Sequence, residues 1–136
     1  MKKIILLFSF LFILNSCMEQ ETLSLEGGEF PVGTWTDLQY NENGFSMART
    51  NRLKENTYGF IFQNNGKLIS RSNSGFCGTP PIVTQDYSGK WKVEGDVLKL
   101  EMDFWGGKII QEWRISSASS RSVTVEITMN EYKYNS

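Results

Sequence analysis

The stretch GKWKVEGDVLKLEMDF, residues 89–104, carries the clearest structural pattern of the chain. In residues 89–94, Trp91 and Val93 share one face, and charged side chains occupy the other. After a Gly-Asp turn, residues 97–104 alternate in the same way, with four apolar side chains on one face: Leu98, Leu100, Met102 and Phe104. A period of two residues is typical of strands with one buried face, and a short glycine turn joins antiparallel strands. The stretch therefore predicts a β-hairpin.

Similar segments follow one another along most of the chain. Further strands are expected at residues 33–40, 57–63, 67–73, 108–115 and 122–129, and the tail EYKYN could extend the last one. Residues 45–52 fit either a short strand or a helical turn. The segments between strands are too short for amphipathic helices, which argues against a parallel α/β fold. Seven or eight antiparallel strands hide their edges most simply by closing, so we predict an all-β, up-and-down antiparallel barrel of about eight strands.

The N-terminal residues have the pattern of a targeting segment. Lys2 and Lys3 precede an apolar run at residues 4–14, which is too short for a permanent membrane span and fits a signal-peptide core. The following Leu14-Asn15-Ser16-Cys17 resembles the lipobox of bacterial lipoproteins, in which the chain is cut before the cysteine and the thiol is acylated. The alternative is an ordinary secretory signal with a chance cysteine.

The lipobox resemblance implies a domain organisation and a location. Residues 1–16 would be the signal peptide, and Cys17 would carry the lipid, including palmitate, that anchors the protein stably in the bacterial envelope. We expect an outer-membrane lipoprotein, with the periplasmic and surface faces both open. Residues 17–29, acidic and without aromatic residues, predict a flexible tether, and residues 30–136 predict the barrel domain.

The charged and catalytic residue types exclude several functions. Without Lys2 and Lys3, the 14 basic residues fall to 12 against 15 acidic ones, and a mildly acidic domain argues against a nucleic-acid partner. The chain has no histidine, which excludes histidine-based triads and histidine metal sites. No nucleophile, phosphate-loop or dinucleotide motif is present in the predicted barrel domain. We therefore expect neither catalysis nor a cofactor nor a metal ion.

Several segments together carry a resemblance to a family. Gly33-Thr34-Trp35 resembles the G-x-W signature of lipocalins. The segments FIFQNNGKLI (60–69), GKWKVEGDVLKLEM (89–102) and GFCGTPP (75–81) resemble, in their order, the lipocalin-like domain lipoproteins of Bacteroidetes-type bacteria. This resemblance implies a lipocalin-like barrel in which Trp35 plugs the closed end and Arg121, at the start of the last strand, covers it.

Aromatic residues on one strand offer a candidate ligand wall. Tyr58, Phe60 and Phe62 share one face, and they predict either the wall of an apolar pocket near the open end or a packed core. If a pocket exists, we expect six lining residues: Tyr58, Phe60, Phe62, Trp91, Leu100 and Trp113. The preferred function is an envelope protein that binds a small hydrophobic ligand without catalysis. The alternative is an interaction or inhibitor module with a packed core, which binds an envelope protein partner.

Three further residues have open roles. Trp105, at a turn after Phe104, fits a partner-binding tip, a lid over the barrel mouth or simple rim packing. Gln111 lies among apolar residues and could orient a ligand, although a rim position that reaches solvent is the favoured reading. If Cys17 is acylated, Cys77 is the only remaining thiol. We then expect Cys77 to be buried, with intermolecular pairing or a redox role as alternatives.

Overall fold

The computed structural model describes residues 23–25, 28–75, 81 and 83–135, with side chains from residue 30 onward. Every regular element in these residues is a β-strand. Within the same residues there is no helix with the length and apolar character needed to cross a bilayer. The all-β class predicted from the alternating pattern is confirmed.

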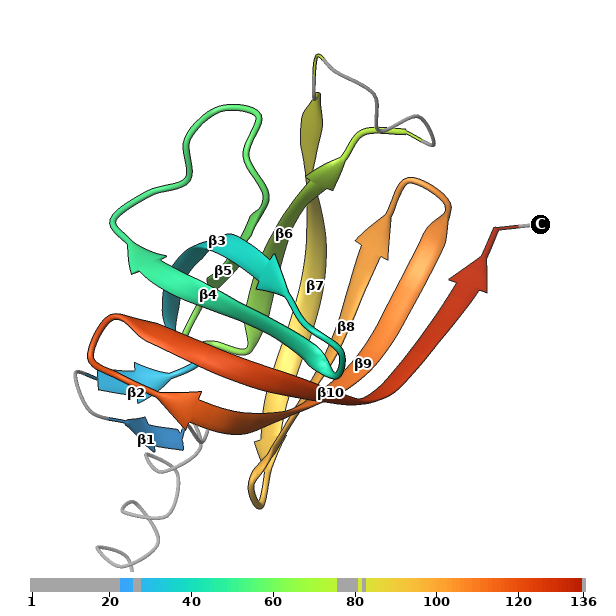
Figure 1. Ribbon diagram of the computed structural model, residues 1–136. Helices are drawn as coiled ribbons and strands as arrows, with labels where there is room; N and C mark the ends of the chain where they lie inside the picture. Colours follow the sequence, from blue (N-terminus) through green and yellow to red (C-terminus); the bar gives the residue numbers. More distant parts are fainter. Residues whose placement is uncertain (1–22, 26–27, 76–80, 82, 136) are drawn as a thin grey trace, which may run out of the picture.

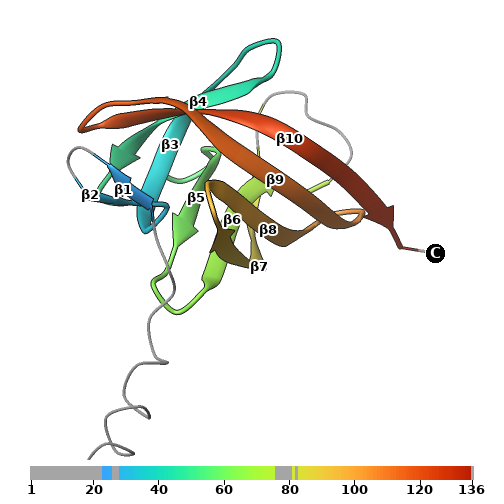
Figure 2. The ribbon, with the colours of Figure 1, turned by 90° about the horizontal axis from the view of Figure 1, so that it is seen from below.

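Eight strands close into an antiparallel barrel, as predicted (Figure 1). The barrel strands are β3 (Gly33–Tyr40), β4 (Gly44–Thr50), β5 (Gly59–Phe62), β6 (Lys67–Asn73), β7 (Thr84–Glu94), β8 (Val97–Phe104), β9 (Gly107–Ala118) and β10 (Ser122–Tyr134). Residues 45–52, for which the sequence left a short strand and a helical turn open, lie mostly in a strand, because β4 pairs with both β3 and β10. The C-terminal tail does extend the last strand, and the antiparallel strands β9 and β10 lie side by side up to Tyr134 (Figure 2).

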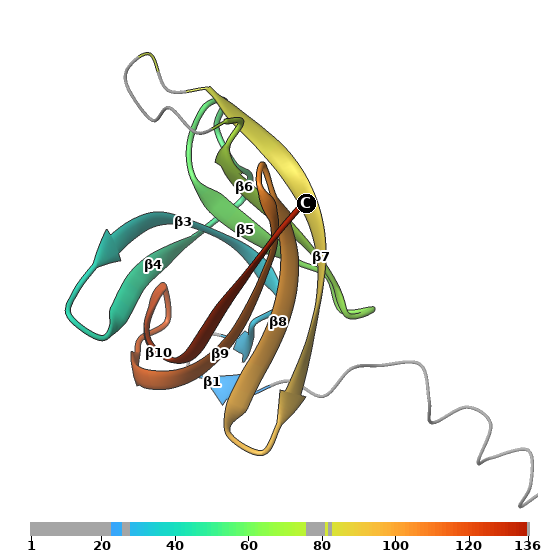
Figure 3. The ribbon, with the colours of Figure 1, turned by 90° about the vertical axis from the view of Figure 1, so that its right-hand side faces the viewer.

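The strand order differs from a simple meander at one point. Around the barrel the strands follow the order β10-β4-β3-β5-β6-β7-β8-β9, so β3 lies between β4 and β5. From β5 onward each strand pairs with the next in sequence. Residues 51–58 therefore connect β4 to β5 past the intervening β3. Strands β3 and β4 lie across the barrel from β7 and β8 (Figure 3).

A glycine allows the barrel to close between β4 and β10. Gly44 pairs with Glu126, and a Cβ atom at Gly44 would lie 2.0 Å from the backbone oxygen of Val125. Two non-bonded heavy atoms cannot approach so closely, so a side chain here would push β10 away from β4. The absence of a side chain at this position is therefore a condition of closure.

The inward faces predicted for residues 89–104 are confirmed except at the end of β8, and elsewhere β-bulges change the inward faces of two strands. Trp91, Val93, Leu98, Leu100 and Met102 are all buried, whereas Phe104 is only half-buried at the end of β8. A β-bulge inserts an extra residue into one strand, so the alternation of faces shifts beyond it.

The bulge in β10 changes which residues face the interior. It lies between Ile127 and Met129, and beyond it Asn130 and Tyr132 line the barrel interior. Regular alternation of residues 122–129 would place Met129 on the inner face with Ile127, and the bulge prevents this. A second bulge, in β3 between Thr36 and Gln39, has the same effect there.

Trp35 closes one end of the barrel, as the lipocalin resemblance implied. The side chain is 1% exposed, its Nε1 donates a hydrogen bond to the Pro31 oxygen at 2.8 Å, and the Phe30 ring packs edge-on at 5.6 Å. The arginine over the indole is Arg49 of β4, with its guanidinium carbon 4.3 Å from the ring centroid. The expectation for Arg121 is wrong, because β4 and not β10 is the neighbour of β3, and Arg121 is exposed.

A short hairpin precedes the barrel within the expected tether. Strands β1 (Leu23–Leu25) and β2 (Gly28–Phe30) pair antiparallel, and the fully buried Phe30 connects the hairpin to the closed end. This part of the expected tether therefore contains paired strands. The predictions for Cys17 and Cys77 concern residues outside the described part of the chain.

Candidate ligand-binding site

Aromatic side chains fill the closed half of the barrel interior. Phe62 and Trp113 are each 1% exposed, and their ring centroids lie 6.1 Å apart in a T-shaped arrangement. The Trp113 ring makes two further edge contacts, to Phe45 at 5.0 Å and to Phe60 at 5.3 Å. Such edge-to-face contacts stabilise a core beyond the burial of area alone. This half of the interior is therefore packed core, one of the two alternatives that the sequence left open.

The open half of the barrel contains a cavity of about 470 Å³. Its wall is contributed by every barrel strand except β7, together with Tyr58 just before β5. The apolar part of the wall consists of Leu38, Phe45, Phe60, Met102, Ile109 and Ile127. The polar part consists of Tyr40, Tyr58, Ser70, Arg71, Ser72, Asn73, Gln111, Asn130 and Tyr132. The second alternative, a pocket near the open end, therefore holds as well.

Gln111 connects the packed core to the cavity wall. Its Oε1 accepts a hydrogen bond from Trp113 Nε1 at 2.8 Å, and its Nε2 donates one to Asn130 Oδ1 at 3.0 Å. Gln111 is 8% exposed, so the favoured prediction of a solvent-reaching rim position is wrong. The indole N–H of a buried tryptophan needs an acceptor, and Gln111 supplies it inside the barrel.

Three tyrosines stand at the mouth of the cavity. The Tyr58 hydroxyl donates to Asn73 Oδ1 at 2.6 Å. The pKa of Tyr40 is raised by desolvation of its hydroxyl and by the nearby phenols of Tyr132 and Tyr58. The three phenols therefore lie near one another, and 75% of the Tyr40 surface is exposed. The mouth therefore has a polar border of phenol groups.

Arg71 is the one charged residue among the described residues of the wall, and its charge is compensated. The guanidinium binds Asp86 through two hydrogen bonds, Nε to Oδ1 at 2.6 Å and Nη2 to Oδ2 at 3.1 Å, and Nη1 donates to the Lys54 oxygen at 3.0 Å. The hydrogen bond from Arg71 lowers the pKa of Asp86, and the same bond raises the pKa of Arg71. A paired geometry of this kind fixes both side chains.

The cavity includes two of the six predicted lining residues. Tyr58 and Phe60 contribute to the wall. The other four predicted residues, Phe62, Trp91, Leu100 and Trp113, lie in the packed core and do not line this cavity. These four side chains do point inward, but they lie nearer the closed end than predicted. Strand alternation predicts the face on which a residue lies and not its height along the barrel.

Sequence reasoning missed most of the remaining wall. Leu38, Asn130 and Tyr132 face inward only because a bulge shifts the alternation of their strands. Ser70 and Ile109 follow the regular alternation of β6 and β9; the pattern places Ile109 on the inward face with Trp113, but not in the wall of a pocket, and the same rule could have found Ser70.

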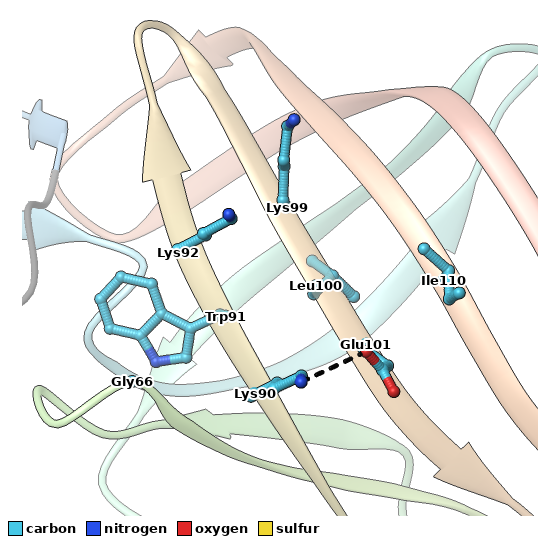
Figure 4. A pocket seen from close by; sticks show the side chains of 8 residues that line it. All are labelled: Gly66, Lys90, Trp91, Lys92, Lys99, Leu100, Glu101 and Ile110. Carbon is cyan, nitrogen blue, oxygen red and sulfur yellow. Dashed lines mark ion pairs between the residues drawn. The ribbon is translucent and has the colours of Figure 1, made fainter.

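A second hollow, of about 350 Å³, lies across β7, β8 and β9 (Figure 4). Lys90, Lys92 and Lys99 border it, and each forms an ion pair: Lys90 with Glu101 at 3.6 Å, and both Lys92 and Lys99 with Glu94 at 2.8 Å. Exposed pairs of this kind contribute little stability and are typical of a solvated sheet face. We therefore assign no ligand to this hollow, although Trp91 and Leu100 form part of its border.

A cluster of four aromatic rings lies beside the mouth. This rim cluster consists of Phe104, Trp105, Tyr132 and Tyr134, with the Phe104 centroid 5.6 to 5.7 Å from the other three. Trp105 is 42% exposed and Tyr134 is 68% exposed. Trp105 does not line the cavity, so the structure favours rim packing with an exposed face over a lid.

No group of three or more His, Cys, Asp or Glu side chains within the described ranges could hold a metal ion. Comparison of the chain with protein-family models, curated proteins and solved structures gives no match. The resemblance to lipocalin-like lipoproteins therefore rests on the sequence segments given above, whereas the closed eight-stranded barrel is established.

Proposed function

We propose that this protein is a lipid-anchored, lipocalin-like protein of the bacterial envelope that binds a small, largely apolar molecule without catalysis. The observation that carries the proposal is the cavity of about 470 Å³ at the open end of the barrel. Small-molecule sites are typically concave spaces of about 300–1,000 Å³ with mostly apolar walls and a few polar groups. The six apolar residues of this wall, together with polar groups from several strands, fit that description.

Two adjacent residues allow a matched test of the cavity. Ile109 lines the cavity, whereas Ile110, next to it in β9, borders the outer hollow. Ile109→Trp should fill cavity space, and Ile110→Trp should add the same ring on the outside. Binding of the neutral fluorescent probe N-phenyl-1-naphthylamine should be strong for wild type and Ile110→Trp and lost for Ile109→Trp. Absence of wild-type binding, or equal binding by the two variants, would refute the proposed site.

The lipid anchor is a separate part of the proposal and is supported by the sequence pattern alone. Leu14-Asn15-Ser16-Cys17 supplies the cysteine, and Cys17→Ser removes the thiol that would be acylated. Metabolic labelling with a palmitate analogue in a bacterial host should mark the wild type and not the Cys17→Ser variant. Labelling of the variant would contradict the assignment.

The rim cluster favours a second candidate function, a protein interaction or inhibitor module of the envelope. Exposed aromatic rings beside one another are enriched at binding interfaces, and Trp105 and Tyr134 have this exposure. Trp105→Ala should then abolish capture of an envelope protein in a pulldown while leaving probe binding unchanged. Capture that is unaffected by Trp105→Ala would count against this candidate.

A further inference from the structure

Ser70 presents an unpartnered hydroxyl to the cavity. The residue is 6% exposed and belongs to the cavity wall on β6. Within the described part of the chain, its Oγ takes part in no hydrogen bond, and no fully enclosed polar side-chain atom there lacks a partner. The Ser70 oxygen therefore retains contact with the cavity space. A buried hydroxyl without a partner is unfavourable unless water or a ligand satisfies it.

Gln111 offers a second polar point in the same wall, from β9. An amide side chain can make four hydrogen bonds, two through its nitrogen and two through its oxygen. Trp113 and Asn130 satisfy one bond at each end and hold the amide in place. The fixed amide can therefore offer both a donor and an acceptor to a ligand without reorienting.

The cavity offers no uncompensated positive charge to an anionic ligand. Arg71 is the only cation of the described wall, and all three of its nitrogen atoms donate to Asp86 or to the Lys54 oxygen. Transfer of a carboxylate from water into such a site is unfavourable, because no partner replaces the lost hydration. A neutral hydroxyl or carbonyl group has a smaller desolvation penalty and finds partners in Ser70 and Gln111.

We propose, building on the proposed function, that the ligand is an uncharged, largely apolar molecule carrying a hydroxyl or carbonyl group, and that Ser70 and Gln111 are the residues that select this group. The six apolar side chains of the wall contact the hydrocarbon part. Ser70 Oγ can donate to a carbonyl or exchange hydrogen bonds with a hydroxyl. The site therefore rejects two kinds of molecule: a hydrocarbon of equal size, which leaves the Ser70 hydroxyl without a partner, and an ionised fatty acid.

Competition among three ten-carbon compounds tests the selection. The assay measures how well 1-decanol, 1-chlorodecane or decanoate displaces N-phenyl-1-naphthylamine from the full-length or signal-cleaved protein. It is run at about pH 8, where a carboxylic acid is ionised. For the wild type, 1-decanol should bind about 3- to 10-fold more tightly than 1-chlorodecane, the factor that one net hydrogen bond provides. Decanoate should bind more weakly than 1-decanol by a larger factor.

Variants of Ser70 identify the residue responsible. In Ser70→Ala the preference for 1-decanol over 1-chlorodecane should fall clearly below the wild-type value, because one of the two selecting groups is gone. Ser70→Thr, which keeps a hydroxyl, should retain most of the preference for 1-decanol. Circular dichroism should give the same spectrum for the wild type and both variants.

The outcomes separate the two proposals. Failure of the wild type to bind the naphthylamine probe overturns the proposed cavity function and this inference together. Probe binding with equal affinities for the alcohol and the chloride, or with decanoate bound most tightly, overturns only the inference. An unchanged preference in Ser70→Ala also overturns it.

Discussion

The hydrogen bond between Trp113 and Gln111 should make a measurable, coupled contribution to stability. The donor is buried at 1% exposure and the acceptor at 8%, and the two atoms lie 2.8 Å apart. We consider Trp113→Phe, which removes the indole N–H, Gln111→Leu, which removes the acceptor, and the double variant. Each single change leaves one buried polar group without its partner, whereas the double change removes both groups.

The expected losses in the free energy of unfolding follow from this difference between the single and the double variants. A buried donor or acceptor left without its partner costs about 1–3 kcal/mol. Trp113→Phe should add a loss of packing, because its ring contacts Phe45, Phe60 and Phe62. We therefore expect Gln111→Leu to lose about 1–3 kcal/mol and Trp113→Phe to lose about 2–4 kcal/mol. The double variant should lose less than the sum of the two, with a coupling energy of about 1–3 kcal/mol.

Urea unfolding followed by far-UV circular dichroism measures the four free energies without relying on tryptophan emission. Trp35→Phe is a matched control, because its indole N–H donates to the Pro31 oxygen at the closed end and not to Gln111. Trp35→Phe combined with Gln111→Leu should be additive within about 0.5 kcal/mol. Additivity of the same size for Trp113→Phe and Gln111→Leu would refute the reasoning.

Two further predictions concern barrel closure and acid stability. Gly44→Ala would place a Cβ atom 2.0 Å from the Val125 oxygen, so we expect a loss of about 1–3 kcal/mol and a lower Tm in thermal unfolding. Hydrogen bonds from Lys92 and Lys99 lower the pKa of Glu94 from its ordinary value of 4.5 to about 2. A lowered pKa stabilises the fold above the unfolded-state value, and this stability is lost as the pH falls through the folded-state pKa. Because these exposed ion pairs contribute little, Glu94→Gln should be only slightly less stable than wild type at neutral pH, and it should lose slightly less stability between pH 4.5 and about 2 in urea titrations.

Each of these two predictions has a control in the same chain. Gly75→Ala introduces a Cβ atom with no atom of the described residues within 4 Å, so its Tm should stay close to that of wild type. An equal loss in both variants would contradict the closure argument. Glu42 is exposed and makes no ion pair with the described residues, so Glu42→Gln should leave the acid profile unchanged. A Glu94→Gln profile that matches wild type would contradict the assigned role of its two lysine partners.

The alternating strands could be predicted from the sequence because their faces are set by a local rule. Residues 97–104 place Leu98, Leu100 and Met102 inside as predicted, since side chains in a regular strand alternate between faces. Closure by β10 against β4 depends on residues far apart in the chain. For that reason the sequence left residues 45–52 undecided, and the lipocalin resemblance implied Arg121 over Trp35 in place of Arg49.

The cavity was harder to predict because it depends on height along the barrel and on bulges. Phe60 and Phe62 both face inward, yet one lines the cavity and the other lies in the packed core. Asn130 reaches the interior only after the bulge in β10, and it is the partner of the buried Gln111 amide. A single extra residue in a strand is not visible in a periodic pattern, so the polar part of the wall was largely missed.

The position of the β1–β2 hairpin sets the direction in which the barrel would face a membrane. The hairpin joins the barrel at the end that Trp35 closes, and β3 runs from there to Tyr40 at the mouth (Figure 1). Under the proposed acylation of Cys17, the lipid anchor would precede this hairpin in the chain and so lie on the side of the closed end. The closed end of the barrel would then face the bilayer, and the mouth of the cavity would open toward the aqueous compartment. Its ligand would be exchanged with that compartment or with a partner across it, and not drawn directly from the lipid beneath.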